Sequence, residues 1–407
     1  MNEHVKIGII KEGKVPPDMR VPLTPDQCAK IQELYPEVEI YVQSSPIRTF
    51  TDEDYRAKGI KVVDDLSHCD IILGVKEVNI EDLIPGKKFI FFSHTIKKQP
   101  YNRKLLRAVI EKKIQLIDYE VLKDRHGKRV IGFGRYAGIV GCYNGLRTYG
   151  LKHNLYSIKP ANECADRKEL EEELKKVKLP SDSRFLITGF GRVGHGAKEI
   201  IDMLPIKEVS PEEYLNNQFN EPVYTHLEVE DYFGRKNGGE FDKSEFYASP
   251  ELYKSTFSKY VDKTDMYIPC HFWNNKADFI LKREDLQRSD NRISVVADIS
   301  CDIAGPIAST IRPSKIADPI YGYDPETGEE VDFMQEGAIA VMAVDNLPCE
   351  LPKDASADFG NELIKEVLPA LLRMDVHGMI DRGSETTLDG ALNEPFVYLQ
   401  DYLEGKE

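Results

Sequence analysis

Short runs of β-branched and aromatic residues alternate along the chain with longer amphipathic stretches. In the first third of the sequence, five apolar runs have the length of a buried strand: VKIGII, VEIYV, DIILGV, KKFIFFS and IQLIDY. The stretches between them include TPDQCAKIQEL and YNRKLLRAVIEKK, which have the periodicity of helices. Strands that alternate with helix-length segments are typical of βαβ units, so this pattern predicts an α/β domain with a parallel sheet.

The same pattern returns after a strongly charged segment at 164–183. That segment carries Glu and Lys at helical i,i+4 spacing, which predicts a solvated helix between two domains. Further strand-like runs follow it: RFLIT, PVYTHLEV, DMYIPC and ISVVADIS. An apolar helix predicted at 354–373 arrives so late that it can pack on either domain. A chain of 407 residues exceeds what one hydrophobic core usually serves, so we predict two α/β domains.

Composition and charge narrow the class of protein. Hydrophobic residues make up 41% and charged residues 30%, the balance of a soluble globular protein. A net charge of −15 argues against nucleic acid as a partner, and no apolar run approaches the roughly 20 residues that cross a membrane. The seven cysteines lack the spacing of a disulfide framework or a zinc site, and no secretory signal is visible. We therefore expect a cytoplasmic protein without a metal site.

A glycine motif opens the second domain. Gly189, Gly191 and Gly194 form G-x-G-x-x-G directly after the strand FLIT and at the start of the helix HGAKEIIDML. The first glycine permits a tight turn, the second lets the backbone approach a pyrophosphate, and the third lets helix and strand pack closely. In this context the motif predicts a dinucleotide site.

The dinucleotide preference depends on the end of the second strand of that domain, where a carboxylate binds the adenosine ribose hydroxyls. An apparent insertion delays this strand, which then supplies Glu228, Glu230 and Asp231. A carboxylate there repels a 2′-phosphate, so we predict NAD rather than NADP.

Ionisable residues follow three apolar strands of the first domain. Arg20 comes after VKIGII by a short loop, Lys76 ends DIILGV, and His94 ends KKFIFFS. Ligands of open parallel sheets bind outside the carboxyl ends of the strands, so these residues predict an acid–base pair beside an anionic substrate. Positive charges in the same region of an acidic chain predict a small-molecule substrate with carboxylates: Lys97, Lys98, Arg129 and Arg135. Glu77 and Glu120, also at strand ends, are candidates to bind an ammonium group or to tune Lys76.

Several motifs occur in an order that resembles one enzyme family. They include RVPLTP, GVKE, SHTIKKQ, LIDYE, GKRVIGFGRYAG, ADISCDIAG and VDNLPCELPKDAS. The chain thereby resembles lysine-forming saccharopine dehydrogenases and lysine–2-oxoglutarate reductases, within the alanine dehydrogenase and pyridine nucleotide transhydrogenase superfamily. The resemblance extends from Lys6 to about Leu372.

The resemblance implies two Rossmann-like domains with the active site in the cleft between them. A substrate domain would comprise 1–146 and 345–407, and an NAD-binding domain would comprise 147–344. The implied reaction interconverts saccharopine with L-lysine and 2-oxoglutarate. Hydride transfer at the carbon of a secondary amine would be followed by hydrolysis of the imine.

The resemblance also implies roles for single residues. Lys76 matches the base that accepts the amine proton, and His94 matches the acid–base group for water. Residues that hold the substrate or shape its pocket would be Arg20, Lys97, Gln99, Glu120, Arg129 and Phe133. Cofactor contacts would be Arg192, Val193, Asp231, Phe272, Ile299, Asp302, Val344, Asp345, Asn346 and Leu347.

Two other functions stay open. An alanine dehydrogenase or another reductive-amination enzyme keeps the fold, cofactor and acid–base pair but changes the substrate. Alanine is too small to need a second carboxylate site, so Glu120 and Arg129 count against it. A dinucleotide-binding sensor without turnover is the third possibility, but a sensor has no need for a proton-transfer pair. The oligomeric state does not follow from the sequence.

Overall fold

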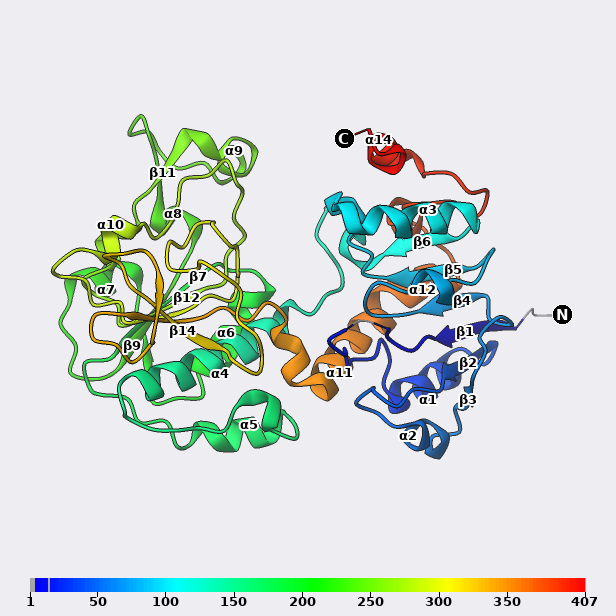
Figure 1. Ribbon diagram of the computed structural model, residues 1–407, viewed down its shortest axis with the longest axis horizontal. Coiled ribbons are helices and arrows are strands. Elements are labelled where there is room, and N and C mark those ends of the chain that lie inside the picture. The colour runs from blue at the N-terminus through cyan, green and yellow to red at the C-terminus, as the bar shows by residue number, and fades with distance from the viewer. Residues whose placement is uncertain (1–3, 14, 407) are drawn as a thin grey trace. The chain divides into compact units, whose positions relative to one another are not determined.

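The computed structural model describes residues 4–13 and 15–406 and divides the chain into two compact units (Figure 1). Unit 1 comprises Met1–Phe133 and Pro352–Glu407, and unit 2 comprises Gly134–Leu351. Each unit is an α/β structure built on a mainly parallel sheet, which confirms the predicted fold class. The predicted cleft between the domains stays a prediction.

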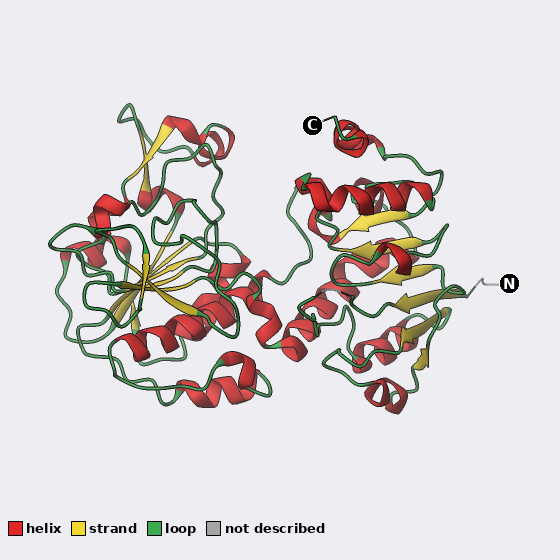
Figure 2. Ribbon diagram, viewed as in Figure 1, coloured by secondary structure: helices red, strands yellow, loops and turns green. Residues whose placement is uncertain are grey.

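Unit 1 contains a six-stranded parallel sheet in the order β3-β2-β1-β4-β5-β6. The chain runs outward from β1 to β3 and then crosses to β4 on the other side of β1. The order therefore reverses between β1 and β4, and Figure 2 shows helices packed along this sheet. Its strands are β1 Val5–Ile9, β2 Val38–Gln43, β3 Lys61–Val63, β4 Ile71–Leu73, β5 Lys88–Phe91 and β6 Gln115–Asp118. Its helices are α1 Pro25–Leu34, α2 Asp52–Ala57, α3 Arg103–Glu111, α11 Pro352–Glu362, α12 Leu368–Leu372, α13 Met379–Arg382 and α14 Gln400–Glu404.

The late apolar helix packs on unit 1. Ser356 of α11 accepts a hydrogen bond from the backbone of Val21 at 2.9 Å, and Gln27 of α1 donates to the carbonyl of Ala357 at 2.7 Å. Phe359 is fully buried in the core of unit 1. The residue pattern left open the domain on which this helix packs, whereas the family resemblance implied the substrate domain, and these contacts place it on unit 1.

Unit 2 contains an eight-stranded sheet in the order β15-β14-β16-β13-β12-β7-β9-β8. The six strands from β16 to β8 are parallel, whereas β14 pairs antiparallel with both β16 and the edge strand β15. The strands of unit 2 are β7 Arg184–Thr188, β8 Lys207–Glu208, β9 Val223–Leu227, β10 Phe233–Arg235, β11 Tyr253–Ser255, β12 Met266–Pro269, β13 Val295–Ala297, β14 Ile320–Tyr323, β15 Glu330–Val331 and β16 Ile339–Met342. Of these, β10 and β11 form a separate two-stranded antiparallel sheet. Its helices are α4 Gly134–Lys152, α5 Arg167–Leu174, α6 Arg192–Ile201, α7 Pro211–Asn216, α8 Val229–Tyr232, α9 Lys243–Ala248 and α10 Arg283–Leu286.

Helix α4 belongs entirely to unit 2, whereas the sequence analysis placed a domain boundary within it, at 146/147. The helix packs within unit 2 because glycines on its surface let neighbouring segments of that unit approach closely. A Cβ atom added to Gly138 would lie 1.9 Å from the carbonyl oxygen of Val193, and one added to Gly145 would lie 2.6 Å from the Cβ of Ala297. The helix therefore packs directly on α6 and β13.

Two other segments expected at domain boundaries also lie in unit 2. The charged segment forms α5, and Arg167 of α5 pairs with Glu199 of α6 at 2.9 Å, so this helix is not a linker between the units. The second boundary falls at 351/352 rather than 344/345, because Glu350 accepts a hydrogen bond from Asn144 of α4 at 2.9 Å. Among the helices described for both units, none is long and apolar enough to cross a membrane.

Candidate active site

The polar residues of unit 1 that the sequence singled out follow the carboxyl ends of its strands. The loop after β1 carries Arg20, the segment after β4 carries Lys76 and Glu77, and the turn after β5 carries His94. In a parallel sheet the carboxyl ends of neighbouring strands meet at one edge. Because β1, β4 and β5 are consecutive in the sheet, these residues share that edge.

A buried ion pair holds the cation after β1. Arg20 and Asp18 are each 2% exposed, and the guanidinium donates from Nε and Nη2 to the two carboxylate oxygens at 3.0 and 2.6 Å. Burial alone would raise the pKa of Asp18, but the charge and hydrogen bonds of Arg20 hold it below the usual value. The guanidinium carbon lies 4.2 Å from the centre of the Phe133 ring. Arg20 is therefore a fixed positive charge at this edge.

His94 is held in one orientation by a carboxylate. Its Nδ1 lies 2.6 Å from Oε1 of Glu77, and its ring stacks on Phe92 with 6.4 Å between ring centres. The backbone of His94 is left-handed, with φ of 55°, which costs a non-glycine residue free energy. Buried hydrogen bonds of the flanking residues hold this turn, since Ser93 donates to Asp118 at 2.6 Å and Thr95 donates to Glu385.

Lys76 shares its surroundings with a carboxyl group that the sequence analysis missed. Glu12 accepts hydrogen bonds from the backbone amides of Val75 and Lys76 at 2.7 and 2.9 Å. Burial raises the pKa of Glu12 to about 8. The charge of Lys76 contributes to lowering the pKa of Asp18, which places the ammonium group in the electrostatic neighbourhood of the Asp18–Arg20 pair.

The ring of Phe92 links the acid–base group to a second cation. The guanidinium carbon of Arg129 lies 5.4 Å from the centre of this ring, and the Phe133 ring lies 6.1 Å from it. His94 stacks on the same ring. The structure thus gathers His94, Arg129 and, through Phe133, Arg20 around one aromatic side chain.

The remaining predicted substrate residues lie nearby in sequence but form separate contacts. Lys97 pairs with Glu120, with 3.3 Å between Nζ and Oε1. Gln99 is exposed, and its backbone carbonyl accepts a hydrogen bond from Tyr402 of α14 at 2.6 Å. The contacts recorded for these residues do not join them to the group around Phe92.

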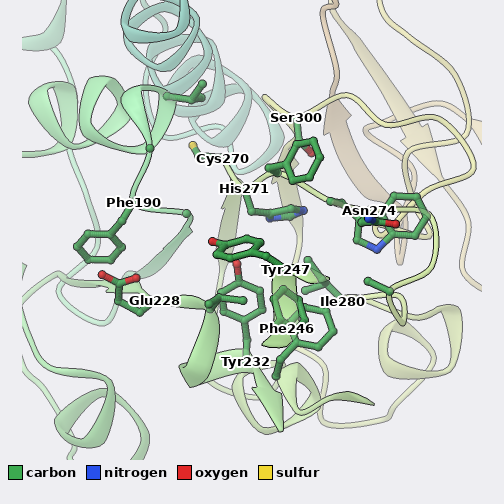
Figure 3. Close-up of a pocket in the computed structure, with 18 of the residues that line it drawn as sticks. Phe190, Glu228, Tyr232, Phe246, Tyr247, Cys270, His271, Asn274, Ile280 and Ser300 are labelled. Carbon is green, nitrogen blue, oxygen red and sulfur yellow. The ribbon is translucent and has the colours of Figure 1, made fainter. Parts of the chain in front are cut away.

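Unit 2 contains a cavity of about 620 Å³ beyond the carboxyl ends of β7, β9, β12 and β13 (Figure 3). Aromatic side chains make up much of its wall. Members of this wall are Phe190, Tyr232, Phe233, Phe246, Tyr247, Phe272 and Trp273. Helix α9 contributes three residues to the wall: Lys243, Phe246 and Tyr247.

The glycine loop after β7 has the geometry that its motif predicts. Gly189 has a φ of +96°, and an added Cβ would lie 2.6 Å from the carbonyl oxygen of Cys270. A Cβ on Gly194 would lie 1.8 Å from the carbonyl oxygen of Gly189, so helix and strand approach too closely for a side chain. A Cβ on Gly191, in the cavity wall, would meet nothing within 4 Å. That open space at the start of α6 fits the close approach of a pyrophosphate.

The structure divides the predicted cofactor residues into two sets. Those in the cavity wall are Gly189, Gly191, Val193, Phe272, Ile299 and Asp302. Those outside the described wall are Arg192, Gly194, Glu230, Asp231, Val344, Asp345, Asn346 and Leu347. At the end of β9 the carboxylate in the wall is that of Glu228, whereas Asp231 turns back to accept from the backbone of Glu228 at 2.8 Å.

Glu228 is not the only charged group at this end of the cavity. Lys243 of α9 pairs with it, with 2.9 Å between Nζ and Oε2, and both side chains are partly exposed.

Across the described residues, no cluster of three or more His, Cys, Asp or Glu side chains has the arrangement of a metal site.

Comparison with known proteins places this arrangement in a family. The model of the alanine dehydrogenase/PNT N-terminal domain matches residues 8–140. Alpha-aminoadipic semialdehyde synthase of Arabidopsis thaliana is 31% identical over 399 residues, which cover 88% of this chain and 37% of that protein. Saccharopine dehydrogenase [NAD(+), L-lysine-forming] of Yarrowia lipolytica is 25% identical, covering 92% of this chain and 93% of that one. The chain belongs to the saccharopine dehydrogenase family, within the alanine dehydrogenase and pyridine nucleotide transhydrogenase superfamily.

A solved structure agrees on the fold of this superfamily. L-alanine dehydrogenase superimposes with a TM-score of 0.62 at 16% identity, covering 99% of this chain and 100% of that one. The chain spans less than half of the length of the Arabidopsis relative.

Three residues of this family member were missed by sequence reasoning: Glu12, Asp18 and His271. All three follow strands of a parallel sheet, namely β1 for the first two and β12 for the third. The strand-end rule that selected Lys76 and His94 would have selected them too. Their burial and pairing, which make them chemically unusual, have no signal in a single sequence.

Proposed function

We propose that this chain is a pyridine nucleotide-dependent oxidoreductase that interconverts saccharopine with L-lysine and 2-oxoglutarate, with NAD as its cofactor. Unit 1 binds the amino-acid substrate at the carboxyl ends of its strands, and unit 2 binds the dinucleotide in its cavity. Membership in the saccharopine dehydrogenase family supports this assignment.

The observation that carries the proposal is the group around Phe92. An oriented imidazole and the guanidinium of Arg129 share that ring, and the buried cation Arg20 lies over the neighbouring Phe133. An acid–base group that shares an aromatic cluster with two fixed cations suits a substrate with more than one carboxylate. Alanine has a single carboxylate and would engage only one of the two cations.

The residues of unit 2 fit a dinucleotide. The open space at Gly191 admits a phosphate group next to the first amides of α6, and Glu228 stands at the end of β9, where a carboxylate binds ribose hydroxyls. A 2′-phosphate would be repelled by that carboxylate, which supports NAD rather than NADP.

The side chains of unit 1 divide the proton transfers between them. A bound NAD would accept the hydride from the glutamyl α-carbon of saccharopine. Lys76 takes the proton of the secondary amine, which leaves an imine. His94 removes a proton from the water that attacks the imine, then donates one to the departing amine of lysine. Glu77 holds Nδ1 and stabilises the imidazolium, so Nε2 is the nitrogen that exchanges protons.

The test measures oxidation of NADH by absorbance with purified protein, 2-oxoglutarate and L-lysine. Each other amino acid, and ammonia, then replaces lysine in turn. Lys76→Met is expected to lower kcat at least 100-fold, since a general base contributes that much or more. Lys58→Met, in an exposed pair with Asp26, is the matched control and should leave the rate unchanged.

The cofactor half is tested separately with Gly191→Ala. Its methyl group occupies the open space in the wall, so the Kd for NADH should rise at least tenfold while the thermal stability stays the same.

In the activity test, faster turnover with alanine or ammonia than with lysine would change the assigned substrate but keep the enzyme class. NADH binding without turnover of any amino acid would refute the enzyme assignment.

A further inference from the structure

His271 is a buried histidine in the wall of the unit 2 cavity whose second nitrogen is unpaired. It follows β12, is 7% exposed, and lies amid the labelled lining side chains in Figure 3. Among the residues that the structure describes, none forms a hydrogen bond with its Nε2. A buried unpaired nitrogen costs roughly 1–3 kcal/mol, so this atom requires an explanation.

A chain of hydrogen bonds determines which nitrogen carries the proton. Thr188 Oγ1 lies 2.8 Å from Nδ1 of His271 and 3.0 Å from the hydroxyl of Tyr267. Tyr267 is fully buried, and burial raises its pKa, so it keeps its proton and donates to Thr188. Thr188 then donates its own proton to Nδ1, and the ring proton of His271 resides on Nε2. The reverse arrangement would leave the buried Tyr267 proton unpaired as well, at a further cost of about 1–3 kcal/mol.

His271 is also uncharged at neutral pH. Burial lowers the pKa of His271 to about 3, because a protonated ring would be a buried cation that lacks both water and a counter-charge. A neutral N–H donor needs no charged partner, so an uncharged oxygen or nitrogen acceptor can satisfy it. Phosphate groups are instead served by the amides of the glycine loop.

The surroundings of His271 indicate which part of a dinucleotide it meets. Its ring centre lies 6.2 Å from that of Tyr232, which lies on α8 directly after Glu228. The end of the second strand of a dinucleotide-binding domain is the side that binds the adenosine ribose. His271 therefore lies on the adenosine side of the cavity.

We propose that His271 is a binding residue of this cavity, donating its Nε2 proton to an uncharged acceptor of the adenosine half of the dinucleotide, a ribose oxygen or a ring nitrogen of adenine. The inference rests on the proposed dinucleotide function of unit 2. It adds a specific contact that the glycine motif does not supply.

The binding test compares NADH, ADP-ribose and nicotinamide mononucleotide by isothermal titration calorimetry with the intact chain. His271→Leu should raise the Kd for NADH and for ADP-ribose about tenfold, the loss of one neutral hydrogen bond. His271→Gln, whose amide N–H reaches a similar position, should raise either Kd less than threefold. His153→Gln, at an exposed histidine of unit 2, is the matched control and should change nothing.

The tautomer test uses the native chain and needs no activity. Nitrogen NMR of histidine-labelled protein should show His271, assigned by its loss in His271→Gln, as the neutral Nε2–H tautomer from pH 5 to pH 9. ADP-ribose should shift that Nε2 resonance. An Nδ1–H tautomer, or equal affinity of native and His271→Leu protein for ADP-ribose, would overturn the inference. A native chain that binds neither NADH nor ADP-ribose would instead overturn the proposed function.

Discussion

The strand ends of unit 1 and the cavity of unit 2 occupy the same topological position but treat charge in opposite ways. In unit 1 Asp18 and Arg20, both 2% exposed, stay charged through pairing, whereas burial raises the pKa of neighbouring Glu12 to about 8. In unit 2 burial shifts the pKa values of two ionisable groups of the wall toward their neutral forms instead. Burial lowers the pKa of His271 to about 3 and raises that of Asp302 to about 6.

The difference corresponds to the two kinds of ligand that we propose. A substrate with carboxylates needs fixed cations and a group that transfers protons, so unit 1 retains charges and pairs them. A dinucleotide presents flat rings, sugar hydroxyls and one pyrophosphate. Aromatic walls, neutral donors and backbone amides suit those groups, and the ion pair of the wall is the outer pair of Glu228 and Lys243. One strand-end architecture therefore supports two chemistries, and the burial of its side chains decides between them.

The largest expected effect comes from breaking the buried pair of unit 1. Arg20→Leu leaves the Asp18 carboxylate buried without its partner. The free energy of unfolding should fall by about 3–5 kcal/mol, measured by urea denaturation. Arg135→Leu, which breaks a half-exposed pair with Glu199, should cost only about 1 kcal/mol or less.

A double variant separates charge from packing. Asp18→Asn combined with Arg20→Leu removes both charges and should recover part of the loss. If the double variant is as unstable as Arg20→Leu alone, lost packing over Phe133 rather than the stranded carboxylate is responsible.

Glu12 predicts a pH dependence of stability that originates in unit 1. Its pKa is about 8 in the folded chain, so the folded state holds a proton that the unfolded chain releases near pH 4.5. Stability should therefore fall as the pH rises from about 4.5 to 8, by at most about 1.4 kcal/mol per pH unit. Glu12→Gln, which needs no proton, should flatten this slope in denaturation curves collected across that range.

The control for this slope is Glu53→Gln, at a side chain that is 80% exposed. It should leave the pH dependence unchanged. An unchanged slope in Glu12→Gln would show that Glu12 is ionised in the folded chain. Glu12 would then belong with Asp18 and Arg20 among the charged groups of unit 1.

Periodicity alone located most of the strands and the long helices. Strand VKIGII became β1 and helix YNRKLLRAVIEKK became α3, because burial of one face imposes a regular spacing. The strand-end rule likewise placed Lys76 and His94 at one edge of a sheet. Both predictions rest on local pattern and sheet direction, which a sequence carries.

Contacts between distant segments could not be predicted. The turn that holds His94 depends on Glu385, which is 290 residues from its partner Thr95. The assignment of α4 depends on which helix and strand approach its glycines, and the sequence shows only that small residues recur. The partner of Glu228 is Lys243 of α9, a helix whose position relative to β9 follows from tertiary packing.

The smallest expected effect concerns this outer pair of unit 2. Lys243 offsets the charge of Glu228 and so weakens its repulsion of a 2′-phosphate. Lys243→Met should raise the Kd for NADPH about threefold and leave that for NADH nearly unchanged, measured by fluorescence titration. The effect is small because both side chains are partly exposed and screened by water and salt.

Salt provides the discriminating condition for this prediction. The ratio of the two Kd values should differ most between native and Lys243→Met protein at low ionic strength and converge as salt is added, since the interaction is between exposed charges. Lys259→Met, at a lysine outside the described cavity wall, is the matched control. Equal weakening of NADH and NADPH would mean that Lys243 supports the aromatic wall through α9. In that case Glu228 alone would determine the discrimination between the cofactors, and the cavity of unit 2 would contain no functional cation.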